Sequence, residues 1–172
     1  IVDAVVEIEI FEVTELGFRR REELLADPHV RVHRAADVEE QQHFHAVAAL
    51  GHEVHGLDIG LYEGCDFGSK PAPIPSLALD VRDVEARHLQ GFDAVIHLAA
   101  LSNDPLGDIN PELTYDINYR ASVRLASCAQ KAGVRRFLFS SSCSLYGAAG
   151  DAPLDEGASF APQTPYGESK IL

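Results

Sequence analysis

Patterns typical of buried strands alternate with helical patterns along most of this chain. Patterns that predict short strands occupy residues 30–32, 52–58, 77–80, 94–98 and 137–139, and the run at 137–139 is continuously apolar. Such runs are typical of strands that are covered on both faces of a parallel sheet. Apolar positions at helical spacing predict helices at residues 37–50, 83–90 and 110–132. Alternating strands and helices predict an α/β fold with a doubly wound parallel sheet.

The longest predicted helix has clear start and stop signals. Asn110 is a favourable N-cap residue, Pro111 suits the first helical position, and Gly133 suits the end. The helix has one apolar face, which we expect to pack on the core. The positions on that face are Leu113, Ile117, Ala121, Leu125, Cys128 and Ala132.

The first 28 residues carry no recognisable chemistry. Val6, Ile8 and Ile10 alternate with glutamates, a period-two pattern that predicts a half-exposed strand. Residues 19–26 could form a short helix before Asp27 and Pro28. We therefore divide the chain into an unassigned segment, residues 1–29, and a Rossmann-like domain, residues 30–172.

Residues 30–58 have the frame of a dinucleotide-binding unit, which is strand, helix, strand and terminal acid, here Asp58. The turn at residues 33–40 contains no glycine. Glycines would let the backbone approach a pyrophosphate, and the following helix would offer it free N–H groups. Here Asp37, Glu39 and Glu40 place carboxylates where phosphates should lie. We expect a Rossmann-like domain that keeps this helix and lacks the glycine-rich loop.

A cluster of hydroxyls, residues 140–144, follows the predicted strand at 137–139. Open α/β sheets bind ligands beyond the carboxyl ends of their strands. Tyr166 and Lys170 lie four residues apart, so on a helix they share one face. A hydroxyl, a phenol and an ammonium group together could move protons to and from a carbonyl or an alcohol.

Composition narrows the classes of partner. The formal net charge of -13 over 172 residues argues against nucleic acid or an anionic membrane surface. No apolar run approaches the roughly 18 residues that a membrane span needs. The cysteines, Cys65, Cys128 and Cys143, form an odd and widely spaced set, which favours reduced thiols in the cytoplasm.

Two side-chain sets invite a sharper interpretation that their context does not favour. The histidines at 43, 45, 52 and 55 match no standard ligand spacing, so we expect no metal. Cys143 lies beside Ser142 and could be taken for a nucleophile. It has no evident base, and we expect a packed thiol.

Six stretches, in this order, resemble the extended short-chain dehydrogenase/reductases, the NAD-dependent epimerase/dehydratase group that acts on nucleotide sugars. They are GHEVHGLD at 51–58, LDVRD at 79–83, HLAALS at 97–102, YDIN at 115–118, FSSSCSLYG at 139–147 and YGESK at 166–170. The resemblance begins at about residue 51. It implies NAD as the cofactor, a nucleotide sugar as the substrate, and it allows a homodimer.

The resemblance also implies roles for individual residues. Tyr166 would transfer the proton as acid and base, while Lys170 would lower its pKa and bind the nicotinamide ribose. A phenol with a pKa of ~10 is a poor base at neutral pH, and a nearby cation favours phenolate. Ser142 would hydrogen-bond the reacting sugar oxygen.

A second set of residues would surround the cofactor. Asp58 would take the adenosine ribose hydroxyls, and its charge disfavours the extra phosphate of NADP. Asp80 and Val81 would contact adenine. The remaining cofactor-lining positions are Leu98, Ala99, Ala100 and Ser102, with Asn118 nearby, in addition to Tyr166 and Lys170.

The chain departs from the family in ways that shape our expectation. None of Arg34, Asp37 and Glu40, at the register of the glycine-rich loop, is glycine. The chain begins without methionine and stops two residues past Lys170, so we expect a fragment that lacks the C-terminal substrate region. A shifted reading frame upstream of about Ala46 is our hypothesis for the abrupt onset. Reading the upstream DNA in all frames tests it, and finding no glycine-rich loop in any frame would reject it.

Two functions remain open on these grounds. The first is part of an NAD-dependent nucleotide-sugar epimerase, dehydratase or reductase, impaired as it stands. The second is a catalytically silent Rossmann-like protein that binds or regulates a partner.

Overall fold

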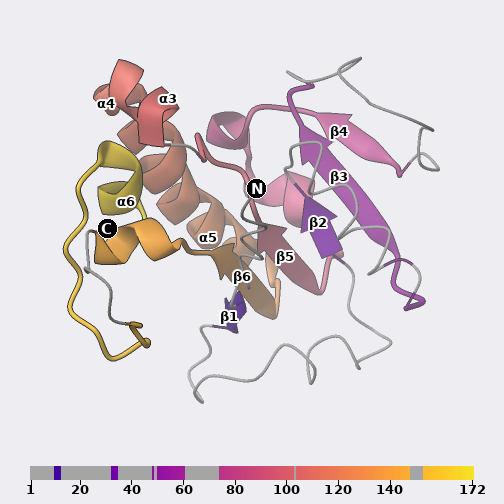
Figure 1. Cartoon of the computed structure of the whole chain (residues 1–172). Helices are drawn as coiled ribbons and strands as arrows, with labels where there is room; N and C mark the ends of the chain where they lie inside the picture. Colours follow the sequence, from indigo (N-terminus) through magenta and orange to yellow (C-terminus); the bar gives the residue numbers. More distant parts are fainter. Residues whose placement is uncertain are drawn as a thin grey trace, which may run out of the picture.

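A single sheet with strand order β1-β6-β5-β2-β3-β4 forms the centre of the protein (Figure 1). The computed structural model describes residues 10–12, 32–34, 48, 50–60, 74–102, 104–147 and 153–172. The strands are β1 (Ile10–Glu12), β2 (Val32–Arg34), β3 (Val54–Asp58), β4 (Ser76–Ala78), β5 (Ala94–His97) and β6 (Arg136–Ser140). Each strand predicted for residues 52–58, 77–80, 94–98 and 137–139 is therefore present, within one or two residues at its ends.

Strands β2 to β6 run parallel and have the doubly wound order of a dinucleotide-binding fold. From β2 the chain proceeds outward to β3 and β4, then returns to place β5 on the other side of β2. Ligands bind beside such a switch point, at the carboxyl ends of the strands. In the neighbouring strands β5 and β6, His97 lies opposite Phe139, so the segments that follow both strands leave the same edge of the sheet. The predicted fold class is confirmed.

The edge next to β6 carries a strand that runs the other way. β1 pairs antiparallel with β6, with Phe11 opposite Phe139. The alternating pattern around Ile10 predicted a strand, and Ile10 lies in it, but nothing local indicated its partner or direction. The predicted strand at 30–32 overlaps β2 at Val32, and residues 30 and 31 lie outside the described residues. The helices predicted for residues 19–26 and for most of 37–50 lie outside the described residues.

The long predicted helix is present and contains an irregular turn. It consists of α4 (Pro111–Tyr115), a π-helical turn η3 (Asp116–Arg120) and α5 (Ala121–Ala132). Asn110 caps its start by accepting a hydrogen bond from the Leu113 N–H at 3.1 Å, and Gly133 ends it with a φ of 79°. A π turn inserts an extra residue and shifts the helical phase. Leu113, predicted to face the core, is therefore exposed, whereas Ala121 and Leu125 are buried.

The region predicted as one helix at 83–90 forms two short 3-10 turns, so that prediction was wrong. They are η1 (Val81–Asp83) and η2 (Ala86–Leu89). The Asp80 side chain accepts from the Arg82 N–H and starts η1, while Val84 and Glu85 between the turns are extended. Short polar side chains that bond to nearby backbone compete with a continuous helix. Val84 and Leu89 are thereby both buried against α5 in the main core.

The remaining helices gather beyond the carboxyl ends of β5 and β6 (Figure 1). They are α3 (Asp104–Ile109), the 3-10 turn η4 (Cys143–Tyr146) and α6 (Pro165–Ser169). The sequence did not predict α3. In the part of the chain that the structure describes, no helix is both long and apolar enough to cross a membrane. No group of three or more potential metal ligands occurs among those same residues.

Candidate functional site

Helix α6 carries two of the expected catalytic residues. The Thr164 hydroxyl oxygen accepts from the Gly167 N–H at 3.1 Å, and Pro165 occupies the first helical position, so the helix start is well defined. Lys170 ends the helix in a helical conformation. Its Nζ lies 5.7 Å from the centre of the buried Tyr166 ring, as the four-residue spacing predicts.

The Lys170 ammonium is held at the end of β6. It donates a hydrogen bond of 2.9 Å to the carbonyl oxygen of Ser140 and lies 4.7 Å from the centre of the Phe139 ring. A carbonyl oxygen and an aromatic face both stabilise a cation. Lys170 therefore directs its positive charge toward the carboxyl end of the sheet, beside the phenol.

Two glycines let the serine segment pack directly against α6. Gly147 ends η4 with a φ of 64°, and a Cβ there would lie 1.9 Å from the Ala161 carbonyl oxygen. A Cβ on Gly167 would lie 2.7 Å from the Ser144 carbonyl oxygen. Ser142 is the N-cap of η4, with its hydroxyl oxygen accepting from the Ser144 N–H at 3.2 Å. The serine turn and the tyrosine helix thus meet backbone to backbone.

A carboxylate that sequence reasoning missed joins these two elements. Asp104, at the start of α3, accepts from the Thr164 hydroxyl at 2.5 Å and from the Ser144 hydroxyl at 3.5 Å. Thr164 lies two residues before Tyr166, and Ser144 lies two residues after Ser142. One side chain therefore ties the segment after β5 to both arms of the site.

Asn118 connects the segment after β5 to α6 through hydrogen bonds of its side-chain amide. Its side chain is 1% exposed, accepts from the Leu101 N–H at 2.8 Å, and donates to the Leu101 carbonyl at 3.2 Å and the Ser169 hydroxyl at 3.1 Å. Ser169 in turn donates to the Tyr166 carbonyl at 2.7 Å. Asn118 was expected near the cofactor, and the structure places its amide in bonds that fix the cofactor-lining segment and the tyrosine helix.

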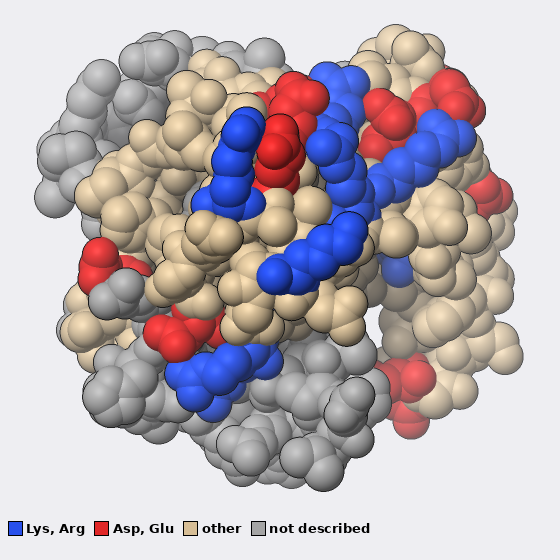
Figure 2. Space-filling view, turned by 180° about the vertical axis from the view of Figure 1, so that it is seen from behind, with Lys and Arg blue, Asp and Glu red and all other residues tan. Residues whose placement is uncertain are grey.

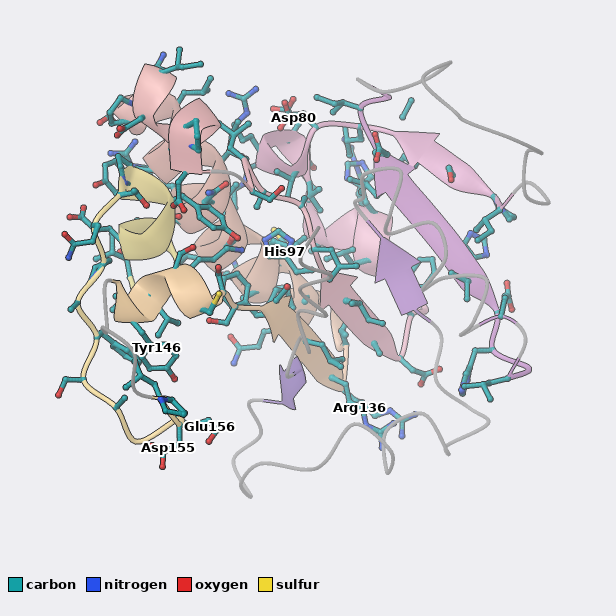
Figure 3. The ribbon with its side chains drawn as sticks, viewed as in Figure 1. Asp80, His97, Arg136, Tyr146, Asp155 and Glu156 are labelled. Carbon is teal, nitrogen blue, oxygen red and sulfur yellow. The ribbon has the colours of Figure 1, made fainter. Side chains whose placement is uncertain are left out.

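His97 is a buried, uncharged histidine at the centre of the molecule (Figure 3). Its Nε2 lies 2.7 Å from the Ser122 hydroxyl, which donates its own hydrogen to the Asn118 carbonyl at 2.5 Å. Nε2 must therefore carry the proton, and Nδ1 has no hydrogen-bond partner among the described residues. Burial, assisted by the Lys170 charge, lowers the pKa of His97 to about 3.

The residues expected at the adenosine end lie at the neighbouring ends of β3 and β4. Asp58 ends β3, where its carboxylate accepts from the Gly60 N–H at 2.5 Å and its carbonyl accepts from the Leu79 N–H at 3.1 Å. Asp80 comes shortly after the end of β4 and lies at the upper edge of the molecule in Figure 3. Val81 is buried in the core. An Arg82 hydrogen bond lowers the pKa of the Asp80 carboxyl.

The other expected residues follow β5 and β6. Leu98, Ala99 and Ala100 are half-buried and Ser102 is exposed, in the segment that Asn118 holds. Cys143 is exposed, so the expectation of a packed thiol was wrong. On a 3-10 turn, residues two positions apart point in different directions, and Leu145 takes the buried position instead.

A model of the "NAD dependent epimerase/dehydratase family" matches residues 41–172. The chain belongs to this family. The match begins about ten residues before residue 51, where the sequence resemblance was placed.

Individual relatives agree with the family match. The chain is 35% identical over 135 residues to a UDP-glucose 4-epimerase of Streptomyces lividans, and the alignment covers 74% of this chain and 39% of that protein. It superposes with a TM-score of 0.72 and 28% identity on a UDP-glucose-4-epimerase from Stenotrophomonas maltophila with bound NAD, covering 83% of this chain and 46% of that one. A "NAD dependent-NDP-hexosamine 5,6-dehydratase" gives a TM-score of 0.70 at 26% identity. The chain thus spans less than half the length of these relatives.

Proposed function

We propose that this chain is the cofactor-binding part of an NAD-dependent nucleotide-sugar epimerase or dehydratase. The observation that carries the proposal is the position of α6, which sets Tyr166 and Lys170 against the serine turn at the carboxyl end of β6. NAD, when bound, supplies the hydride acceptor for such a reaction. The protein's own residues must then bind the cofactor, orient the sugar and move one proton.

Tyr166 is the residue that would transfer this proton. The ammonium of Lys170, near its ring, favours the phenolate and so makes the phenol a better base near neutral pH. The phenolate would take the proton of a sugar hydroxyl as the carbon that bears this hydroxyl loses a hydride, and it would return the proton when the carbon is reduced. Ser142 would hydrogen-bond the same oxygen and hold it in place.

NAD binding is proposed at the residues named above, with Asp58 on the adenosine ribose and Asp80 near adenine. The segment from Leu98 to Ser102 would line the cofactor. The residues described here fit NAD at both ends, since carboxylates can accept from ribose and amino groups while Lys170 can donate to a ribose. The turn at residues 33–40 fits poorly, because its carboxylates would repel the pyrophosphate.

We therefore expect the chain to bind NAD weakly and to leave a UDP-sugar unchanged. Fluorescence titration with NADH tests the first point, and a dissociation constant in the micromolar range would contradict it. The triple substitution Arg34→Gly, Asp37→Gly and Glu40→Gly should increase NADH affinity, because it removes two carboxylates and lets the backbone approach phosphate.

The same glycine-free turn favours a second candidate function, a catalytically silent Rossmann-like protein that pairs with or regulates an active relative. The triple variant separates the two. Recovery of NADH affinity supports the enzyme, whereas no gain in affinity, together with stable capture of a family member by the unaltered chain, supports the binding protein. The first proposal includes residues 30–172 as the cofactor domain and an isomerase or oxidoreductase activity. It also includes a cytoplasmic location and a homodimer.

A further inference from the structure

Arg82 follows the expected adenine contacts, Asp80 and Val81, in the sequence and forms an ion pair with Asp80. Its Nη2 lies 2.7 Å from Asp80 Oδ2, its Nε donates to Asp80 Oδ1 at 3.0 Å, and its backbone N–H donates to the same oxygen at 2.8 Å. A guanidinium that grips both oxygens of a carboxylate fixes the plane of that carboxylate as well as its position. These three bonds hold the Asp80 carboxylate in the observed orientation.

The arrangement leaves Asp80 with one acceptor position unused by these bonds. An ionised carboxylate offers about two acceptor sites on each oxygen. Oδ1 accepts twice from Arg82 and Oδ2 accepts once. The second acceptor site of Oδ2 is therefore the one that these bonds leave available to a ligand amino group.

Arg82 is itself held by the helix that carries Asn118. Its Nη1 lies 3.5 Å from Asp116 Oδ2, in the first residue of the π turn, and its carbonyl oxygen accepts from Arg124 Nη1. Asp116 also lies 3.9 Å from Arg120. Figure 2 shows acidic and basic side chains next to one another on the rear face of the molecule, in keeping with such alternating pairs. The guanidinium of Arg82 therefore has two carboxylate partners, Asp80 and Asp116.

We propose that Arg82 is a positioning residue of the cofactor site, which orients Asp80 to accept a hydrogen bond from the exocyclic amino group of adenine. The inference rests on the proposed NAD site and extends it to base selectivity. A base with a carbonyl in place of that amino group would set an acceptor against the fixed Oδ2. Lysine would keep the charge at position 82 and lose the fork, so it should not replace arginine.

The test compares NADH with its deaminated analogue, reduced nicotinamide hypoxanthine dinucleotide, by NMR titration, which measures weak binding. Both ligands are titrated into the unaltered chain, Arg82→Gln, Arg82→Lys and the control Arg87→Gln. Arg87 pairs with Glu85 at 3.2 Å on the exposed surface and makes no described contact with Asp80. The unaltered chain and the control should prefer NADH by roughly tenfold, the size of one hydrogen bond to a charged group. Both Arg82 variants should prefer it by less than about threefold.

Each outcome decides a different point. Because both ligands are measured on the same sample, partial unfolding of a variant cancels from the ratio. An Arg82 variant that keeps or increases the tenfold preference overturns the positioning role. Equal binding of the two ligands by the unaltered chain overturns the Asp80 contact and this inference with it, while NAD binding stands. Failure to bind either ligand contradicts the proposed function itself.

Discussion

Acid should destabilise this protein through His97 more than through any exposed histidine. The pKa of His97 is lowered from 6.5 to about 3 in the folded protein by burial and by the Lys170 charge. The unfolded chain therefore binds a proton at this residue below about pH 6.5, whereas the folded protein does not. The stabilisation is complete above pH 6.5 and is lost as the pH falls toward 3. Between pH 7.5 and 5 the loss in free energy of unfolding is about 2 kcal/mol.

Urea unfolding at pH 7.5 and pH 5 measures this loss. His97→Gln removes the titration and keeps an amide that can donate to Ser122, so its free energy of unfolding should change by about 2 kcal/mol less over the same interval. Equal pH dependence of His97→Gln and the unaltered chain would refute the reasoning. So would an NMR titration of His97 near pH 6.5.

Two further predictions concern glycine geometry and thiol exposure. Gly147→Ala should destabilise the fold by more than about 3 kcal/mol, because its Cβ would meet the Ala161 carbonyl oxygen. Gly133 has a similar φ but open space around it, so Gly133→Ala should cost about 1 kcal/mol. Equal losses of thermal stability in the two variants would contradict this. Cys143, which is exposed, should react with a thiol reagent faster than the half-buried Cys128, and mass spectrometry that finds Cys128 modified first would contradict the structure.

Features with a local cause were predictable from the sequence. Asn110 and Gly133 delimit a helix because a cap and a left-handed turn depend on a few adjacent residues. Strand β6 was predictable because the continuous apolar run at residues 137–139 is typical of a strand in a parallel sheet. The π turn was not predictable, because one extra residue leaves the spacing of apolar residues along the sequence almost unchanged. The same extra residue nevertheless turns Leu113 away from the core.

Features that depend on distant partners could not be predicted. Asp104 bonds to Thr164, 60 residues away, and His97 bonds to Ser122, 25 residues away. Neither residue stands out by type or spacing. The direction of β1 likewise depends on pairing with β6. Tyr166 and Lys170 were predictable because one helical turn relates them, whereas the groups that hold their helix in place were visible only in the fold.

We propose that NAD binds at the face that carries Tyr166 and Lys170. A titration with NADH of the unaltered chain, Lys170→Ala and the control Lys131→Ala, an exposed lysine of α5, tests it most directly. We predict weak, saturable binding to the unaltered chain and to Lys131→Ala, and at least about a fivefold loss of affinity in Lys170→Ala, since one charge-assisted hydrogen bond is removed. Equal affinity of Lys170→Ala and the unaltered chain would contradict the claim.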